Sequence, residues 1–244
     1  MITKVEGIVI NELEYGETSK IINVLTSNLG VIGIMVKGAR TLKSQFTSST
    51  LKLTYATFHI NYKEGKLSLL TAVDIINNFK NIRKDIIKIS YASFLLELAS
   101  QVSKHSIKDL AYSMLKSSLL KIEENYDAMI ITNILELKYL ELLGVMPIID
   151  CCSVCESTKS IATLSSFKGG YVCNNCINGD KLVSEKTIKL IRMFYYVDIE
   201  KITKLDIGEQ SKMEINNFLN DYYDRYTGLY LKSKNFVENL EKLK

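Results

Sequence analysis

Residues 152–176 read CSVCESTKSIATLSSFKGGYVCNNC, and their four cysteines decide how the middle of the chain folds. Two C-x2-C pairs, separated by 17 residues, are formed by Cys152 with Cys155 and by Cys173 with Cys176. Two residues between thiols let one tight turn present both sulfurs to a single ion, and two such turns complete the tetrahedral shell of a structural Zn²⁺ site. Because that shell is closed, the metal is expected to hold structure and to do no chemistry.

Other readings of the cysteines stay open at this point, namely a pair of disulfides or free thiols. Gly169 and Gly170 precede the second pair and permit the tight, positive-φ backbone of a metal-binding turn. Cys151 adjoins Cys152 and is interpreted as a spectator, not as a fifth ligand.

The rest of the sequence indicates the cellular compartment of the protein. Hydrophobic residues make up 47% of the 244-residue chain, enough for a real core, yet no apolar run approaches the ~20 residues that span a bilayer. Residues 1–6 lack the apolar core of a signal peptide. We therefore expect a cytoplasmic protein, in which reduced cysteines favour metal over disulfides.

The positive charge is concentrated in one segment, although the net charge of the whole chain is only +4. Residues 18–63 contain no Asp or Glu, and their cations are Lys20, Lys37, Arg40, Lys43, Lys52 and Lys63. A localised positive field attracts a polyanion, and nucleic acid is the usual one. The alternative is an ordinary solvated basic surface.

The same N-terminal segment has the pattern of a small β-barrel. Five strand-like runs are predicted at residues 5–13, 21–26, 31–36, 53–59 and 66–75, with no helix between them. Five short strands favour an OB-fold, the five-stranded barrel that binds single-stranded nucleic acid.

After residue 79 apolar residues recur at helical spacing. Helices are predicted at residues 82–102, 110–122, 128–143, 209–226 and 230–243, with a further helix through residue 197 that is capped by Ser184. Gly144 and Pro147 are expected to end the third of these helices. The fold class is therefore α+β, with residues 1–78 as the barrel, 79–147 and 181–244 as a helical domain, and 148–180 as an inserted four-cysteine module.

The candidate nucleic-acid site is the loop that leaves the third strand, residues 36–44. Lys37, Arg40 and Lys43 recur there at three-residue spacing around a glycine and could reach successive phosphates. Nearby Tyr55, Phe58, Tyr62 and Phe46 could stack on bases, although barrel core is the favoured interpretation for Tyr55 and Phe58.

No catalytic machinery is recognisable in the sequence. His59 and His105 each stand alone, and the chain has neither a GxxxxGK[ST] phosphate loop nor a GxGxxG fingerprint. The favoured interpretation is a protein that is not an enzyme.

In these residues the chain resembles the bacterial DNA repair protein RecO family over nearly its whole length. The resemblance rests on Gly7-Ile8-Val9-Ile10, Tyr15-Gly16-Glu17-Thr18, Lys37-Gly38-Ala39-Arg40, Leu135-Glu136-Leu137-Lys138, Leu142-Leu143-Gly144 with Pro147, and Leu231-Lys232-Ser233 with Phe236. The cysteines with Gly169-Gly170 are similar to the zinc-containing branch.

The resemblance implies a recombination mediator. Such a protein binds single- and double-stranded DNA, anneals complementary strands, and contacts the acidic tail of single-stranded DNA-binding protein. With RecR it helps load RecA onto DNA coated by that protein. DNA binding is carried onto Lys37, Arg40 and Lys43, and the acid-free stretch adds Lys20 and Lys52.

Two positions, Thr41 and Glu156, depart from the family pattern. Thr41 stands where a second arginine is common, and Glu156 stands where a glycine is common. Thr132 and Asn133 are uncharged where an arginine would be sought for the acidic tail, so that tail is assigned only to the helical region.

Two rival functions come from other classes. The first is a zinc-ribbon transcription or translation factor that binds nucleic acid with the ribbon itself, which the few cations between the cysteine pairs, Lys159 and Lys168 beside Glu156, disfavour. The second is an enzyme, such as a nuclease, with the ribbon as an accessory, which the lack of a carboxylate cluster disfavours.

Overall fold

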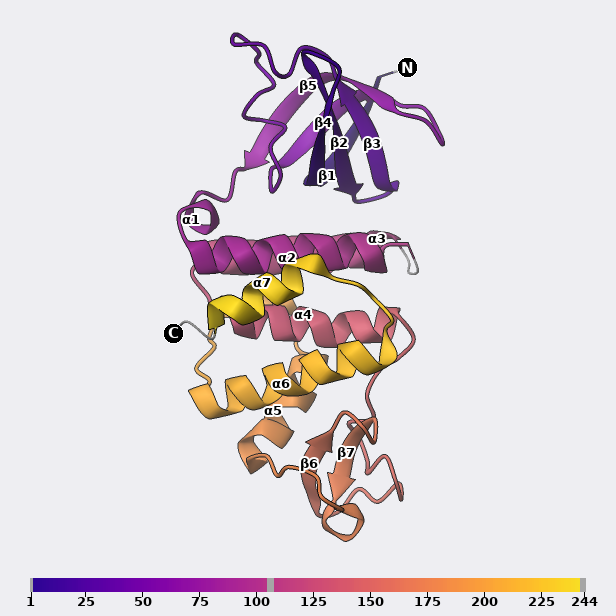
Figure 1. Ribbon diagram of the computed structural model, residues 1–244, viewed down its shortest axis with the longest axis vertical. Helices are drawn as coiled ribbons and strands as arrows, with labels where there is room; N and C mark the ends of the chain where they lie inside the picture. The colour runs from indigo at the N-terminus through magenta and orange to yellow at the C-terminus, as the bar shows by residue number, and fades with distance from the viewer. Residues whose placement is uncertain (1, 105–107, 242–244) are drawn as a thin grey trace. The chain divides into compact units, whose positions relative to one another are not determined.

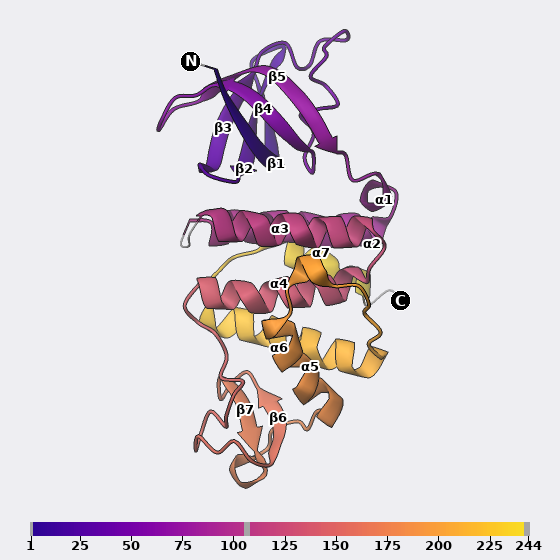
Figure 2. The same ribbon diagram turned by 180° about the vertical axis from the view of Figure 1, so that it is seen from behind.

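Two compact units form the protein in the computed structural model, which describes residues 2–104 and 108–241 (Figures 1 and 2). The first unit combines Met1–Glu124 with Leu231–Lys244, and the second is Asn125–Tyr230. The chain therefore leaves the first unit once and returns to it with its last helix. The predicted domains, residues 1–78, 79–147, 148–180 and 181–244, stay a prediction.

The first unit contains a closed five-stranded barrel, which confirms the predicted OB-fold. Its strands are β1 (Ile2–Tyr15), β2 (Ser19–Thr26), β3 (Gly30–Val36), β4 (Tyr55–Asn61) and β5 (Ser68–Asn77). They are ordered β1-β2-β3-β5-β4, and β1 pairs with β4 to close the barrel. The β3–β5 pairing is parallel, and the other four pairings are antiparallel.

Alternation along the strands fills the barrel. Successive side chains of a strand point to opposite faces, and every second residue of β2 and β4 is buried. Phe58 is fully buried in the barrel core, and Tyr55 is 7% exposed. The interpretation as barrel core is confirmed for Phe58, whereas Tyr55 is buried outside the barrel's core cluster and its hydroxyl donates to the Glu6 carboxylate at 2.5 Å. Neither ring is free to stack on a base.

Helices α1 (Lys80–Arg83), α2 (Ile86–Val102), α3 (Lys108–Glu123) and α7 (Lys232–Glu241) complete the first unit. The continuous helix predicted from residue 82 is instead broken before Ile86. The Asp85 carboxylate accepts hydrogen bonds from the backbone N–H of Ile87 (2.8 Å) and Lys88 (3.1 Å), so it starts a new helix. The apolar spacing predicted an uninterrupted helix because it does not show where a side chain such as Asp85 bonds to the backbone and starts a new one.

The second unit contains three helices and a small hairpin among its described elements. These are α4 (Ala128–Leu142), β6 (Ile161–Ser165), β7 (Gly170–Cys173), the 3-10 turn η1 (Asn174–Cys176), α5 (Glu185–Tyr196), the 3-10 turn η2 (Ile199–Lys201) and α6 (Glu209–Tyr226). The predicted cap is confirmed, because Ser184 Oγ accepts a hydrogen bond from the N–H of Thr187 at 3.1 Å. Gly144 adopts φ +74° just beyond α4, as a helix-ending glycine should.

A carboxylate from α2 holds the start of α7. The Glu97 side chain accepts hydrogen bonds from the backbone N–H of Lys232 (3.1 Å), from the N–H of Ser233 (2.9 Å) and from the Ser233 hydroxyl. Burial raises the pKa of Glu97, but these hydrogen bonds outweigh burial and hold the pKa below its usual value. The Leu231-Lys232-Ser233 motif is thus the capped entry to the last helix, where the chain returns to the first unit.

Glu97→Gln should lower the free energy of unfolding by about 1–2 kcal/mol at pH 7, since it weakens a charged helix cap. The folded pKa lies below the ordinary 4.5, so this stabilisation is complete above pH 4.5 and is lost as the pH falls through the folded pKa. Urea unfolding of both proteins between pH 7 and pH 3 measures it. The exposed Glu64, changed to Gln, is the control, and equal stability of parent and Glu97→Gln at pH 7 would contradict the capping role.

Candidate functional site

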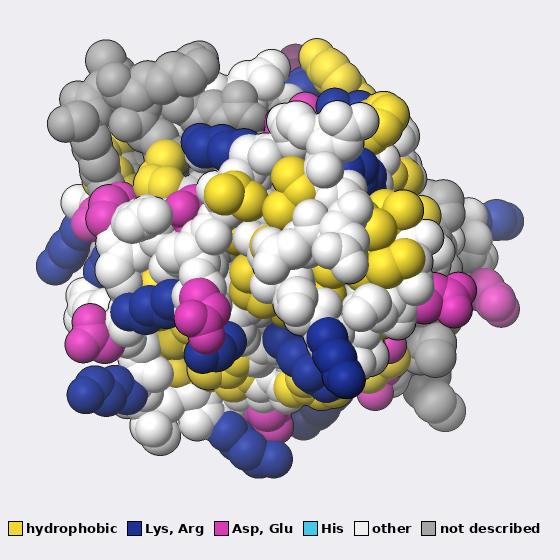
Figure 3. Space-filling model, turned by 90° about the horizontal axis from the view of Figure 1, so that it is seen from below, with side chains coloured by type: hydrophobic (Ala, Val, Ile, Leu, Met, Phe, Trp, Pro, Cys, Tyr) yellow, Lys and Arg dark blue, Asp and Glu magenta, His cyan; other side chains and the backbone are white. Residues whose placement is uncertain are grey.

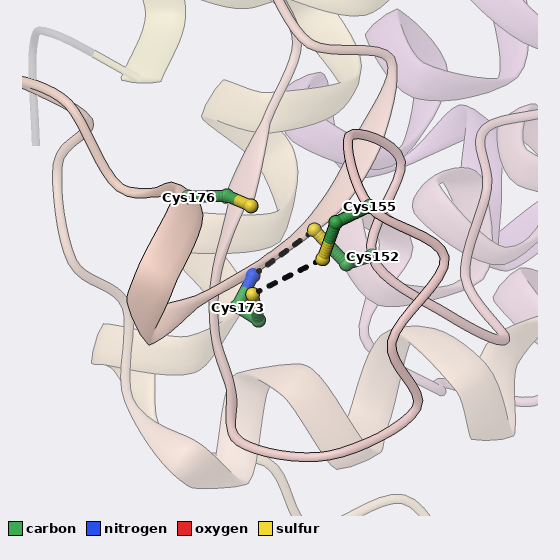
Figure 4. Close-up of side chains that lie close together, drawn as sticks. All are labelled: Cys152, Cys155, Cys173 and Cys176. Carbon is green, nitrogen blue, oxygen red and sulfur yellow. Dashed lines mark hydrogen bonds between the residues drawn. The ribbon is translucent and has the colours of Figure 1, made fainter.

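The four paired cysteines of the second unit converge on one point (Figure 4). Cys173 ends β7, Cys176 ends η1, and Cys152 and Cys155 come from the loop before β6. Their sulfur atoms all lie within 4.8 Å of one another, and the Sγ atoms of Cys155 and Cys173 are 3.6 Å apart. Metal–sulfur bonds of about 2.3 Å in a tetrahedron place sulfurs about 3.8 Å apart. All five cysteines are free thiols, so the cluster fits a metal ion.

The first cysteine turn is held by its own backbone. Cys152 N–H donates to the carbonyl of Ser157, and Glu156 N–H donates to the carbonyl of Cys152, both at 2.8 Å. Glu156 has φ +62°, in the left-handed region that favours glycine. Glu156, which stands where the family commonly has glycine, is therefore strained, but the hydrogen bonds of the turn still form.

The acidities of the thiols also fit a cation. Burial works against the Cys152 thiolate, but backbone N–H groups of Cys173, Val154 and Cys155 lower the pKa of Cys152 to about 6. The pKa of Cys176 rises to about 12, first because its thiol is hydrogen-bonded with Cys155 and then because its surroundings are desolvated. Neighbouring thiols cannot all ionise together without a compensating positive charge, and a divalent ion supplies that charge.

The second cysteine turn is positioned by a close backbone approach. Tyr171 N–H donates to the carbonyl of Ile148 at 2.8 Å, and Ile148 N–H donates to the carbonyl of Gly169 at 2.9 Å. A Cβ on Gly170 would lie 2.1 Å from the Ile148 carbonyl oxygen. The positive φ expected at the two glycines is confirmed, at +80° for Gly169 and +153° for Gly170, but the need for Gly170 comes mainly from space.

Charge around the cysteine module is mixed. Lys168 Nζ lies 2.5 Å from the Asp180 carboxylate and donates to the carbonyl of Cys176 at 2.8 Å. On the face of the molecule drawn in Figure 3, Lys and Arg side chains are interspersed with Asp and Glu side chains. One of the two cations between the cysteine pairs is therefore committed to holding the second turn.

The predicted basic loop, residues 36–44, lies in the connection between β3 and β4 of the first unit, which spans residues 37–54. Lys37 and Lys43 are both exposed there. Arg40 is also exposed, but its guanidinium lies 2.9 Å from the Glu14 carboxylate and donates to the carbonyls of Gly16 and Glu17. Arg40 thus ties this loop to the turn between β1 and β2.

The two cations added from charge counting are placed differently. Lys20 Nζ lies 2.7 Å from Glu12, and the Lys20 side chain is 8% exposed. Lys52 is half-buried, and burial lowers its pKa although Glu97 acts in the opposite direction. The structure therefore brings Lys37, Arg40 and Lys43 into one loop and holds Lys20 apart in an ion pair on the strands.

The ion pairs of Lys20 with Glu12 and of Arg40 with Glu14 could not be predicted by counting charges along the sequence. Strand β1 lies antiparallel to β2 with Glu14 opposite Lys20, and it supplies acids to a stretch that contains none. Leu42 was also missed, although it is an apolar residue between Arg40 and Lys43, and its side chain is fully exposed.

The two histidines were the remaining candidates. His59 Nε2 lies 2.7 Å from Asp74 on the neighbouring strand β5, an arrangement that supports the barrel. His105 lies outside the described residues. Among the described helices, none combines the length and the apolar character that crossing a membrane requires.

The closed barrel places the chain in the class of proteins that carry an OB-fold, an architecture that binds oligonucleotides or oligosaccharides in many proteins, here together with helices and a four-cysteine cluster. Residues 1–79 match the family described as Recombination protein O N terminal, and residues 83–235 match Recombination protein O C terminal. The chain belongs to the RecO family of DNA repair proteins.

Curated relatives agree along the full length. The DNA repair protein RecO of Bacillus pumilus (strain SAFR-032) is 35% identical over 248 residues, which cover 100% of this chain and 96% of the relative. The DNA repair protein RecO of Bacillus cereus (strain AH187) is also 35% identical, over 99% of both chains. The family supports a role in DNA repair and recombination.

Gly170→Ala should destabilise the second unit by about 2 kcal/mol or more, because the new Cβ would collide with the Ile148 backbone. Gly179→Ala is the matched control, since Gly179 has φ +76° but nothing within 4 Å of its missing Cβ. That control should cost only about 1 kcal/mol. Thermal unfolding measures both, and equal losses in the two variants would show that space at Gly170 is not limiting.

Proposed function

We propose that the chain is a recombination mediator that binds single- and double-stranded DNA, anneals complementary strands and, with RecR, helps load RecA onto DNA coated by single-stranded DNA-binding protein. It acts on chromosomal DNA in the cytoplasm, and no covalent chemistry is involved. The family supports the repair role, and the residues of the barrel support the mode of binding.

One observation carries the DNA-binding part. Lys37 and Lys43 are exposed on one loop of an OB-fold barrel, and no ion pair among the described residues neutralises them. Arg40 stands between them, and its pairing with Glu14 is itself exposed, at 37% and 76% of the two side chains. Exposed ion pairs are weak, so a phosphate can compete with Glu14 for this guanidinium.

The mechanism is electrostatic capture that tolerates any sequence. Each phosphate neutralised by Lys or Arg releases condensed counterions, so binding weakens steeply as salt rises. Two complementary strands repel each other through their backbones, and a basic surface that neutralises both at once favours their annealing. Lys20 and Lys52 stay candidates for this surface, although their burial ranks them below the loop.

The metal part of the proposal is a structural Zn²⁺ held by Cys152, Cys155, Cys173 and Cys176. Four thiolates are the ligand set that structural zinc prefers, and the bound ion would offset their mutual repulsion. The four cysteines would hold the ion between the cysteine turns and the hairpin, and a shell of four thiolates would leave no coordination position for a substrate.

The partners are proposed from the family. We assign the acidic tail of single-stranded DNA-binding protein to the helical region, without naming residues. Thr132 and Asn133 on α4 are 2% and 0% exposed, so neither presents an obvious contact for that tail. RecR and RecA complete the proposed set of partners.

Changing Lys37 and Lys43 together to Ala should reduce the salt slope for single strands by about 1.4, because each phosphate contact contributes about 0.7. Adding Arg40→Ala should flatten the slope further and slow annealing. Anisotropy of a labelled oligonucleotide across a salt series measures the slope, and fluorescence quenching of paired strands measures annealing.

The matched control changes the exposed Lys159 and Lys186 of the second unit to Ala. The control removes the same charge and should leave the slope as in the parent. A slope that falls in the control and not in the loop variant would refute the basic-loop assignment and favour the rival in which the ribbon binds nucleic acid.

Cys173→Ser should lower the melting temperature and abolish binding of about one Zn²⁺ per chain, while DNA affinity per folded molecule stays unchanged. Calorimetry and elemental analysis measure the two effects, and a chelator should reproduce the thermal effect on the parent. Cys151→Ser is the control, because Cys151 lies outside the cluster. A zinc-free parent with an unchanged melting temperature would refute the structural role.

A further inference from the structure

The loop that carries the basic residues is firmly anchored at its base. Ala39 is 1% exposed and belongs to the barrel core, and Phe46 packs against the same core. Thr47 Oγ1 donates to the carbonyl of Ala39 at 3.0 Å, which joins the two halves of the loop. The segment between Ala39 and Phe46 is therefore a short excursion from a fixed base.

The excursion is itself held in tight turns. Arg40 N–H donates to the carbonyl of Thr18 at 2.8 Å, and Ser44 N–H donates to the carbonyl of Thr41 at 3.0 Å. The Thr41 backbone N–H and hydroxyl both donate to the carbonyl of Gly38, at 3.2 and 2.9 Å. Leu42 and Lys43 therefore lie at the tip of the loop, and hydrogen bonds hold the backbone on both sides of them.

Leu42 at this tip is the most exposed large apolar side chain among the described residues. Its relative exposure is 107%, and the next highest value is 75%, for Phe167. A single exposed apolar residue is ordinary on a protein surface, but this one stands between Arg40 and Lys43 at the end of an anchored loop. Because it buries nothing in the folded chain, its side chain contributes no packing to stability.

We propose that Leu42 contacts nucleobases when the neighbouring cations bind phosphates, and that this contact gives the loop a preference for single strands over duplex. The inference rests on the proposed DNA binding by this loop and adds a residue to it. Phosphates and sugars are polar, so the faces of the bases are the main apolar surface a strand offers to leucine. Proteins that bend duplex DNA insert apolar side chains, leucine among them, between base steps, and they do so at the cost of unstacking those bases.

The preference for single strands follows from base stacking. In a single strand the base faces are accessible, and proteins bind them by stacking aromatic side chains on them. Covering the same faces with an apolar side chain such as leucine also removes apolar surface from water. In a duplex the same faces are covered, and exposing them costs a few kcal/mol per step. A loop that holds bases through Leu42 therefore loses that contact when two strands pair, which favours release of the annealed product.

The test compares Leu42→Ala with the parent on single strands carrying 2-aminopurine and on blunt duplex, across a salt series. Leu42→Ala should weaken single-strand affinity about three- to tenfold at every salt concentration, since truncation removes apolar contact and no charge. The salt slope should be unchanged, duplex affinity should stay the same, and the 2-aminopurine fluorescence change should be lost.

Two further variants keep the test decisive. Leu42→Met retains a long apolar side chain and should behave as the parent. Ile86→Ala, at an exposed position of α2 (61% exposed), removes apolar surface elsewhere and should change no binding parameter. All three variants should have melting temperatures close to that of the parent, because both side chains are largely exposed.

The outcomes separate this inference from the proposed function. If the parent binds DNA in a salt-dependent way and Leu42→Ala binds single strands with the same affinity, the role of Leu42 is overturned and the proposed function stands. Equal weakening on single strands and duplex overturns the base contact. Absence of salt-dependent binding by the parent overturns the proposed function and this inference together.

Discussion

Strand β1 pairs with β2 along one edge and with β4 along the other, and this double pairing closes the barrel on which the rest of the first unit depends. At 14 residues it is the longest described strand. A register shift between Val9 and Asn11 interrupts its pairing with β2, and an extra residue of this kind bends a strand. The bend lets one strand serve two neighbours around a closed barrel.

The carboxylates of β1 then organise what surrounds the barrel. Glu6 accepts hydrogen bonds from the hydroxyls of Tyr55 (2.5 Å) and Tyr112 (2.8 Å), so it joins the barrel to α3. The Tyr55 hydroxyl is the main reason that the pKa of Glu6 lies below its usual value. Glu12 and Glu14 bind Lys20 and Arg40. The same strand that builds the barrel thus selects which cations remain available to a ligand.

The second unit depends on a comparable constraint, a close backbone contact beside the cysteine cluster. The hairpin β6–β7 meets the chain at Ile148 through a glycine, and this contact sets where Cys173 and Cys176 lie relative to Cys152. Cys173 N–H donates to Cys152 Sγ at 3.4 Å, a bond that spans the two cysteine pairs (Figure 4). The sulfurs are therefore brought together by the protein framework as well as by any ion they hold.

Much of this architecture could be predicted because it depends on local patterns. Strand alternation predicted the five-stranded barrel, the spacing of Cys152, Cys155, Cys173 and Cys176 predicted their cluster, and Ser184 predicted a helix start. Each of these signals lies within a short window, where backbone geometry alone relates residue spacing to direction. The break before α2 was missed, because a capping side chain overrode the apolar period.

The tertiary structure decided which residues of the candidate site are accessible. Neutralisation of Arg40 by Glu14, capping of α7 by Glu97 from 135 residues away, and the need for Gly170 beside Ile148 all depend on pairs that only folding brings together. The sequence by itself determined the barrel, the cysteine cluster and the family. Which cations stay exposed and which side chain stands at the tip of the basic loop were decided by tertiary contacts, because charge and exposure depend on neighbours in space.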